Sequence, residues 1–329
     1  MTPLLEAINI GKVFKSGGLI RKNETTALED FNLQIQDSPP TITGIAGESG
    51  SGKTTLAKVL LGFIAPSEGK VLYKGKELIK MTKSERIIFR REVQAVFQDP
   101  FEVYNPFHKI DHVLTTPLAK YHLAGSKTKM REMIESALKV IGLQPGETLG
   151  RYPHQLSGGQ RQRVMVARAF VLKPRIIIAD EPVSMVDASI RATILKSLLI
   201  LKKEYGISLL YISHDLTTAY QISDNIMVLY MGSLVEAGDV EMVIKEPQHP
   251  YTRLLISSIP STYPENKWMH ADNISVHQSF EDRNYEKKAC KFVDRCPHAM
   301  AICTQKIPGL YHTSPSHTVR CFLYNDGVE

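Results

Sequence analysis

One glycine-rich run, Gly47-Glu48-Ser49-Gly50-Ser51-Gly52-Lys53-Thr54-Thr55, has the residue types and spacing of a loop that binds a polyphosphate. It matches the pattern G-x-x-x-x-G-K-[ST], in which the glycines let the backbone approach the phosphate oxygens closely. Lys53 would reach the outer phosphates, and the Thr54 hydroxyl would bind Mg²⁺. We therefore expect ATP and Mg²⁺ to bind here, with Gly47, Gly50, Ser51, Gly52, Lys53, Thr54 and Thr55 as the contacting residues.

Polar side chains follow three further apolar runs, each of which reads as a buried strand. Asp180 and Glu181 follow one run: Asp180 fits the Mg²⁺-binding aspartate of a phosphate-loop enzyme, and Glu181 would act as the general base. His214 would contact the terminal phosphate. Gln98 would bind Mg²⁺ and position water, although a lone Gln there is more often a turn residue. Parallel strands present their carboxyl ends at one edge of a sheet, so these groups should meet in one crevice.

A second anion site is indicated by Ser157-Gly158-Gly159-Gln160, which stands just before a predicted helix over 160–172. Serine is a good N-cap, and the two glycines leave the helix amides open to an anion. One ATP needs only one phosphate cradle. We therefore expect a head-to-tail dimer in which this segment serves the nucleotide of the partner.

The elements that position these groups alternate between apolar strands and helices. Residues 41–46 read as the strand before the phosphate loop and 55–61 as the helix after it, and 107–141 read as helical. Two strands, 5–13 and 26–35, precede the loop, and 225–238 read as a hairpin. Phe14 follows the first strand, where it could stack on adenine or simply pack in the core.

The sequence has four cysteines, Cys290, Cys296, Cys303 and Cys321, spaced C-x5-C-x6-C-x17-C. Structural zinc usually shows a tight C-x2-4-C pair, so this wider spacing favours a [4Fe–4S] cluster. His298, His312 and His317 keep Zn²⁺ as an alternative, and thiols without a metal are a third. Residues 261–289 are polar and read as a linker.

Composition places few limits on function. The 329 residues carry a net charge of +6 without a concentrated basic segment, which gives little support for nucleic acid as a partner. No apolar run approaches the ~18 residues needed to span a bilayer, and the sequence does not start with a signal-peptide pattern. We expect a chain that stays inside the cell.

Taken together, these motifs resemble the ATP-binding subunits of ABC transporters, over residues 5 to about 260. The segment Ser157-Gly158-Gly159-Gln160 corresponds to the family's signature. The resemblance implies roles for residues of this chain: Phe14 stacks on adenine, Gln98 is the Q-loop glutamine, Asp180 binds Mg²⁺, Glu181 is the catalytic glutamate and His214 is the switch histidine. Ser184–Asp187 matches the D-loop, with Val186 where the family usually has leucine.

The segment 247–255 and the cysteine tail resemble the oligopeptide/dipeptide importer ATPases, and the Gly17-Gly18-Leu19 loop resembles the second ATPase of such importers. This resemblance implies a second, different ABC ATPase, two transmembrane permeases and an extracytoplasmic solute-binding protein as partners. It places the chain on the cytoplasmic face of the membrane and also implies the [4Fe–4S] cluster. Oligopeptides, dipeptides, nickel chelates and oligosaccharides stay open as substrates. The loop 99–106 departs from the usual small-residue pattern.

We therefore expect an α/β P-loop NTPase fold with three additions: an antiparallel β subdomain, a helical subdomain over about 99–165, and a small C-terminal cysteine-rich module. The domain division is 1–260 for the ATPase, 261–289 for the linker and 290–329 for the module. The rival function is a soluble ABC ATPase of DNA repair or translation, although the sequence has neither a second ATPase head nor a sustained heptad run. A kinase of the P-loop class does not explain Ser157–Gln160.

Overall fold

The computed structural model describes residues 2–16, 23–99, 104–259 and 289–325. Its centre is a sheet of eight strands in the order β11-β12-β10-β9-β3-β8-β7-β6. The strands are β3 (Ile42–Ala46), β6 (Val93–Val96), β7 (Ile176–Asp180), β8 (Ser208–Ser213), β9 (Asn225–Tyr230), β10 (Ser233–Asp239), β11 (Tyr311–Ser314) and β12 (His317–Val319). The run β9-β3-β8-β7-β6 is parallel. This confirms the predicted α/β fold of a P-loop NTPase.

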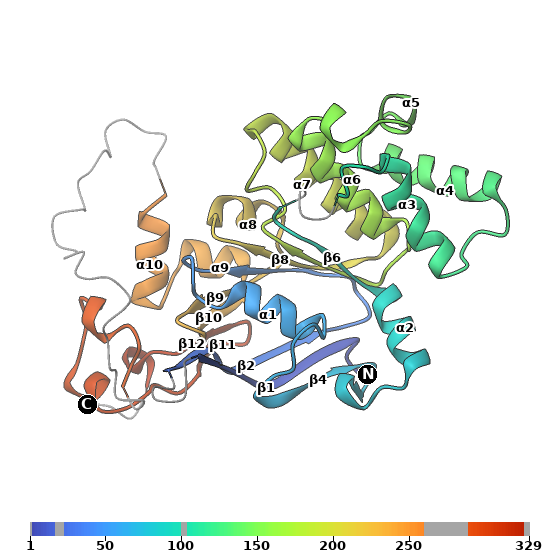
Figure 1. The fold of residues 1–329 in the computed structure, drawn as a ribbon. Helices are drawn as coiled ribbons and strands as arrows, with labels where there is room; N and C mark the ends of the chain where they lie inside the picture. Colours follow the sequence, from blue (N-terminus) through green and yellow to red (C-terminus); the bar gives the residue numbers. More distant parts are fainter. Residues whose placement is uncertain (1, 17–22, 100–103, 260–288, 326–329) are drawn as a thin grey trace.

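A second, antiparallel sheet has the order β2-β1-β4-β5 and lies along the lower edge of Figure 1. Its strands are β1 (Leu5–Ser16), β2 (Asn23–Ile35), β4 (Glu68–Tyr73) and β5 (Lys76–Glu77). The first two are longer than the predicted 5–13 and 26–35, because their antiparallel pairing continues to Ser16 and Asn23. The Gly17–Leu19 loop between them lies outside the described residues.

Helices cover both faces of the central sheet. They are α1 (Lys53–Leu60), α2 (Lys83–Glu92), α3 (Ile110–Lys120), α4 (Lys127–Val140), α5 (Pro145–Thr148), α6 (Gly158–Phe170), α7 (Ala188–Tyr205), α8 (Leu216–Ile222), α9 (Val240–Lys245) and α10 (Pro250–Ser257). Helices α3 to α6 stand together at the upper right of Figure 1. The stretch predicted as helical over 107–141 is two helices, since the chain turns at Tyr121–Ser126 between α3 and α4.

Burial on both faces explains why the central strands read as unbroken apolar runs. In β8, Leu209 and Tyr211 pack into the core on one face, with helices α6 and α7. Leu210 and Ile212 alternate with them and pack into the core on the other face, with α1 and the antiparallel sheet. This double burial fixes the strand register, and with it the positions of the polar residues that follow each strand.

The cysteine-containing segment joins the central sheet. Strand β12 pairs antiparallel with β10, matching Gly238 with His317, and β11 pairs with β12. Figure 1 shows this segment in red at the lower left, beside β10. Between it and α10, the predicted linker lies outside the described residues except for Ala289. In the described part of the chain, no helix has the length and apolar character to cross a membrane.

Candidate functional site

The phosphate loop runs from the end of β3 to the start of α1, as predicted. A Cβ on Gly47 would lie 2.2 Å from the Leu229 carbonyl oxygen, so only glycine fits where the loop passes β9. Lys53 is 6% exposed, and its ammonium group donates to the carbonyl oxygens of Gly47 (2.7 Å) and Glu48 (2.8 Å). Burial lowers the pKa of Lys53, and nearby carboxylates, Glu181 first among them, oppose that shift. The loop thus holds one buried cation inside a ring of backbone groups.

The two acids predicted to follow an apolar strand lie at the carboxyl end of β7. Asp180 is 5% exposed, and burial raises the pKa of its carboxyl group against the opposing effect of the Thr54 hydroxyl. One oxygen of Asp180, Oδ1, is buried without a hydrogen-bond partner in the described structure. A buried oxygen of this kind beside a threonine hydroxyl is suited to a hard cation such as Mg²⁺, which prefers oxygen ligands.

Glu181 and His214 form the second contact across the strand ends. Oε1 of Glu181 lies 2.9 Å from Nδ1 of His214, which follows β8. The Glu181 backbone is left-handed, with φ of 50°, and its N–H donates to the Ile212 carbonyl oxygen at 2.9 Å. A non-glycine residue in this region is strained by about 1–2 kcal/mol, and such strain concentrates at functional sites. The left-handed backbone at Glu181 therefore points the carboxylate in a different direction from that of a residue continuing β7 as an extended strand.

Two further predicted residues, Gln98 and Phe14, are exposed. Gln98 is exposed just beyond the end of β6. Phe14 lies within β1, where it pairs with Thr25 and is 43% exposed, with the Lys12 ammonium 5.3 Å from its ring centre. The alternative that Phe14 is an ordinary core residue is wrong, because an exposed ring on a strand is not part of either core. Its exposed face is free to stack on a planar ligand.

The second predicted cradle is a capped helix start, as expected. The Ser157 hydroxyl accepts from the Gln160 N–H (3.2 Å), and the Gln160 side chain accepts in return from the Ser157 N–H (2.9 Å). This capping box leaves the N–H groups of Gly158 and Gly159 at the tip of α6. Helix α6 packs on α3, α4, α7 and β6, whereas α1 packs on β2 and β7. The two helix starts are thus held by different parts of the molecule.

The segment Ser184–Asp187 connects the acidic pair to α7. The Ser184 hydroxyl donates to the Glu181 carbonyl oxygen at 3.0 Å, so the segment is tied to the left-handed turn. Val186 packs against the core in place of the expected leucine, and Met185 is 57% exposed. An exposed methionine beside a functional turn suits a contact with another subunit.

All four cysteines lie in the part of the chain that the structure describes, and each is a free thiol. Burial raises the pKa of Cys290 and Cys296, and it raises that of Cys321 to about 11. Each of these three thiols also interacts electrostatically with Cys303. Thiolates, not thiols, bind metals. Among residues 2–16, 23–99, 104–259 and 289–325, no three His, Cys, Asp or Glu side chains are grouped closely enough to hold a metal ion. In this arrangement the described residues form no ligand set for a single ion such as Zn²⁺.

Sequence reasoning missed a set of residues around the phosphate loop. The Glu48 carboxylate is bound by Arg295 of the cysteine segment, and the Glu48 N–H donates to the Tyr251 hydroxyl at 2.9 Å. Neither partner lies in a motif that predicts such a contact, and Arg295 is 247 residues from Glu48.

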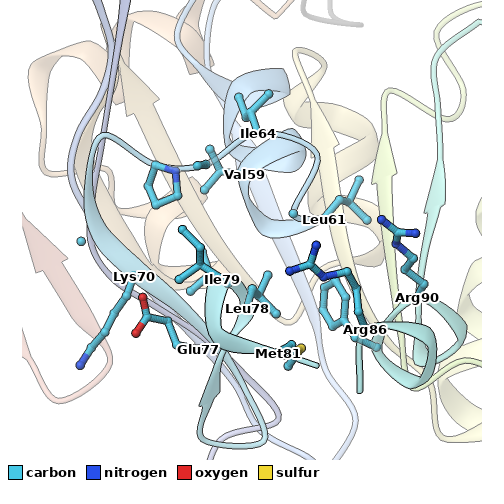
Figure 2. A pocket seen from close by; sticks show the side chains of 16 residues that line it. Val59, Leu61, Ile64, Lys70, Glu77, Leu78, Ile79, Met81, Arg86 and Arg90 are labelled. Atoms are coloured by element: carbon cyan, nitrogen blue, oxygen red, sulfur yellow. The ribbon is translucent and has the colours of Figure 1, made fainter. Parts of the chain in front are cut away.

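A cavity of about 250 Å³ lies away from this site (Figure 2). It is formed where the loop between α1 and β4 faces α2, with Leu61, Leu78 and Ile79 on its walls and Arg86 and Arg90 on one side. The residues predicted to bind ATP are not part of its lining. Its volume is also below the usual range of about 300–1,000 Å³ for ligand pockets.

Comparison with known protein families gives two matches. The pattern of the family described as "ABC transporter" matches residues 28–184, and that described as "Oligopeptide/dipeptide transporter, C-terminal region" matches residues 235–303. The first covers the phosphate loop and the acidic pair. The second covers most of β10, all of α10 and three of the four cysteines, as far as Cys303.

Similar curated proteins carry related names. The chain is 38% identical over 278 residues to the oligopeptide transport ATP-binding protein OppF of Escherichia coli, covering 84% of this chain and 82% of that protein. It is 35% identical over 323 residues to the dipeptide transport ATP-binding protein DppF of Haemophilus influenzae, covering 98% of this chain and 97% of the relative. The oligopeptide transport ATP-binding protein AppF of Bacillus subtilis is 35% identical over 326 residues, with 98% of both chains covered.

Among solved structures, the chain is similar to the dimeric ATP-binding cassette MJ0796 bound to ADP and phosphate. The TM-score is 0.63 at 28% identity, covering 72% of this chain and 98% of that one. The cbiO1 subunit of the cbiONQ transporter from Clostridium perfringens gives a TM-score of 0.63 at 26% identity, covering 75% of this chain and 92% of that one.

Proposed function

The chain belongs to the ABC transporter family, among the oligopeptide and dipeptide transport ATP-binding proteins, and from this membership we propose that it powers the import of peptides across the cytoplasmic membrane. As a member it is an ATP-hydrolysing transporter subunit. The observation that carries the substrate proposal is the match of one chain to both the ABC transporter pattern and the oligopeptide/dipeptide C-terminal pattern. Oligopeptides and dipeptides are favoured over nickel chelates and oligosaccharides by the names of the relatives.

The phosphate loop would hold the triphosphate, and the strand ends would carry out its hydrolysis. Lys53 and the loop amides neutralise and orient the phosphates, which is most of the catalysis in phosphoryl transfer. Glu181 accepts a proton from the attacking water, and His214, 2.9 Å from it, is placed to sense the terminal phosphate. Phe14 offers its exposed face to the adenine ring.

Mg²⁺ fits the residues that would hold it. Asp180 has a buried oxygen with no other partner, and it shares its surroundings with the Thr54 hydroxyl. Gln98 is exposed at the neighbouring strand end and would add a third oxygen. When bound, Mg²⁺ would neutralise charge on the phosphate oxygens during transfer.

We place a second ATPase subunit against the exposed start of α6. Ser157 and the amides of Gly158 and Gly159 would cap the phosphates of the nucleotide bound by the partner, so that two ATP molecules lie between two subunits. This arrangement draws support from the dimeric form of the MJ0796 cassette. Exposed Met185 lies on the connection from Glu181 to α7, where a partner would make contact. We propose a different ATPase as this partner, as the importer resemblance implies.

Two permease subunits would dock beside Gln98. A groove of about 280 Å³ runs along the end of β6 and α3, with Phe63, Phe97, Pro117 and Tyr121 on its walls. Phe63 is 59% exposed, and its ring centre is 6.1 Å from that of Phe97. An exposed aromatic groove of this kind suits an inserted helix. The chain would then be a peripheral subunit on the cytoplasmic face, and an extracytoplasmic solute-binding protein would select the substrate.

The domain division stays a proposal: the ATPase domain over 1–260, with its helical subdomain over about 99–165, the linker over 261–289 and the cysteine-rich module over 290–329. The [4Fe–4S] cluster and its Zn²⁺ alternative also stay predictions. Iron, sulfide and zinc analysis of protein purified without oxygen tests them. Less than about 0.1 iron per chain would exclude the cluster, and less than about 0.1 zinc per chain would exclude the Zn²⁺ alternative.

The test of the proposed function is co-purification of the chain from native membranes in mild detergent, with the partners identified by mass spectrometry. We expect two permeases, a different ATPase and a solute-binding protein. The solute-binding protein can then be screened with peptides. Recovery of a soluble homodimer, or of nucleic acid with repair or translation factors, would overturn the importer in favour of the soluble class of ABC ATPases.

A further inference from the structure

The cysteine segment contacts the phosphate loop directly. Arg295 donates from both terminal nitrogens to the Glu48 carboxylate, at 2.9 Å and 3.0 Å. Glu48 is the second residue of the loop. The side chains are 25% and 29% exposed, so the pair is largely shielded from water. A bidentate arginine–carboxylate pair is directional as well as charged, so it fixes the orientation of the Glu48 side chain.

Aromatic rings hold Arg295 in place. Its guanidinium carbon lies 5.7 Å from the ring centre of Tyr230 and 5.5 Å from that of Phe292. Phe292 is 2% exposed and meets Tyr230 and Tyr251 edge to face, at 5.3 Å and 5.5 Å. The hydroxyl of Tyr251 in turn accepts the N–H of Glu48. One aromatic cluster therefore supports both the backbone and the side chain of Glu48.

A second cationic residue of the segment, Lys291, holds the turn on the other side of the loop. Lys291 donates to the Met231 carbonyl oxygen at 2.8 Å and to the Ser233 hydroxyl at 2.7 Å, and it pairs with Glu29 at 2.6 Å. Between Met231 and Ser233, the N–H of Gly232 donates to the carbonyl oxygen of Ser51, inside the loop, at 3.0 Å. The turn between β9 and β10 is thus fixed on one side to Lys291 and on the other to the loop.

The charge of Glu48 gives these contacts a consequence for nucleotide binding. A carboxylate within a triphosphate-binding loop repels the ligand, and the Glu48 charge reaches Lys53, where it opposes the lowering of that pKa by burial. Arg295 is the cation that compensates Glu48. Without Arg295, the loop would keep the negative charge of Glu48 and lose the contact that orients the Glu48 carboxylate.

We infer that Arg295 is a positioning residue for ATP: from the cysteine segment, it orients and neutralises Glu48 so that the phosphate loop can accept the triphosphate. The inference rests on the proposed function, because it concerns the same ATP site. Lys291 supports the loop from the opposite side through the turn at Gly232. Through Arg295 and Lys291, the segment that extends the sheet also supports the phosphate loop.

The test measures MgATP binding to the full chain by titration, and KM and kcat of ATP hydrolysis in the assembled transporter. Arg295→Ala should raise the dissociation constant and KM about tenfold, with kcat within twofold. Arg295→Lys, which keeps the charge but loses the bidentate geometry, should raise them about threefold. The double variant Glu48→Gln with Arg295→Ala should return to within threefold of the unsubstituted chain, because it has no carboxylate left to compensate.

Arg320→Ala is the matched control. Arg320 also lies in the cysteine segment, but it pairs with an acid of the antiparallel sheet, Asp30, at 3.1 Å, rather than with a residue of the phosphate loop. It should leave MgATP binding unchanged. Equal KM values for Arg295→Ala and Arg320→Ala, or no recovery in the double variant, would overturn the inference.

If Arg295→Ala does not fold, Arg295→Lys and the double variant decide the question: binding by Arg295→Lys equal to the unsubstituted chain would overturn the inference. A chain that binds no MgATP without any substitution would overturn the proposed function as well. If the unsubstituted chain binds MgATP and Arg295→Ala binds it equally well, this inference alone is overturned.

Discussion

Replacing Glu181 by Gln separates ATP binding from ATP hydrolysis. The structure allows this change with little disturbance, because Gln has the shape of Glu and can keep the 2.9 Å contact to His214. Both residues bear the same strain at φ of 50°, so the backbone does not favour either. What is lost is the carboxylate that we propose as the acceptor of the proton of the attacking water.

Loss of a general base lowers a rate by about 10²- to 10⁴-fold, which corresponds to about 3 to 5 kcal/mol of activation free energy. We therefore expect kcat of the assembled transporter to fall by that factor. Lys53, the loop amides and the pair Thr54 and Asp180 are untouched, so the dissociation constant for MgATP should stay within threefold.

The assay is phosphate release by the reconstituted transporter together with MgATP titration of the full chain. Glu204→Gln is the control, since it removes an exposed acid near the end of α7. Turnover within tenfold of the unsubstituted transporter would refute the assignment of Glu181 as the base. A loss of ATP binding equal to the loss of turnover would refute the separation of the two roles.

Three further predictions concern the tail, the pH dependence and the permease contact. A Cβ on Gly238 would lie 2.4 Å from the Ser316 carbonyl oxygen, so Gly238→Ala should cost about 1–3 kcal/mol and speed hydrogen exchange in β12, whereas Gly125→Ala, with open space around it, should not. Burial lowers the pKa of His249 to about 3. Below pH 6.5 the His249 imidazole is therefore protonated in the unfolded chain but stays neutral in the folded chain. As the pH falls from 6.5 to 3, the free energy of unfolding should fall by up to about 1.4 kcal/mol per pH unit. Denaturant unfolding at each pH measures this slope, and a slope for His249→Asn as steep as that of the unsubstituted chain would contradict the prediction. Phe63→Asp should reduce permease recovery in detergent at least fivefold without changing MgATP binding, and unchanged recovery would argue against the groove.

The grouping of the phosphate loop with Asp180, Glu181 and His214 could be predicted because its signals are local. The phosphate loop is a continuous pattern, and Asp180, Glu181 and His214 each follow an apolar strand, so a parallel sheet must bring them to one edge. The left-handed turn at Glu181 could not be predicted, because glutamate has no preference for that conformation.

The contacts between the cysteine segment and the loop gave no signal in the sequence. Arg295 and Glu48 are 247 residues apart, and an isolated arginine between two cysteines has many possible partners. The spacing of the cysteines indicated a metal site, but spacing along the chain does not fix how four thiols are placed in space. The pairing of β12 with β10 was missed for the same reason, since three residues are too few to show a strand pattern.

The distance along the chain between Glu48 and Arg295 also sets an order in time. At about 5 to 20 residues per second, a ribosome needs about 10 to 50 seconds to add the 247 residues that separate them. During that interval a nascent chain has its phosphate loop but neither Arg295 nor strand β12. With the role inferred for Arg295, the nucleotide site is completed late in synthesis, and a nascent chain whose loop has emerged before Arg295 is made would bind ATP weakly.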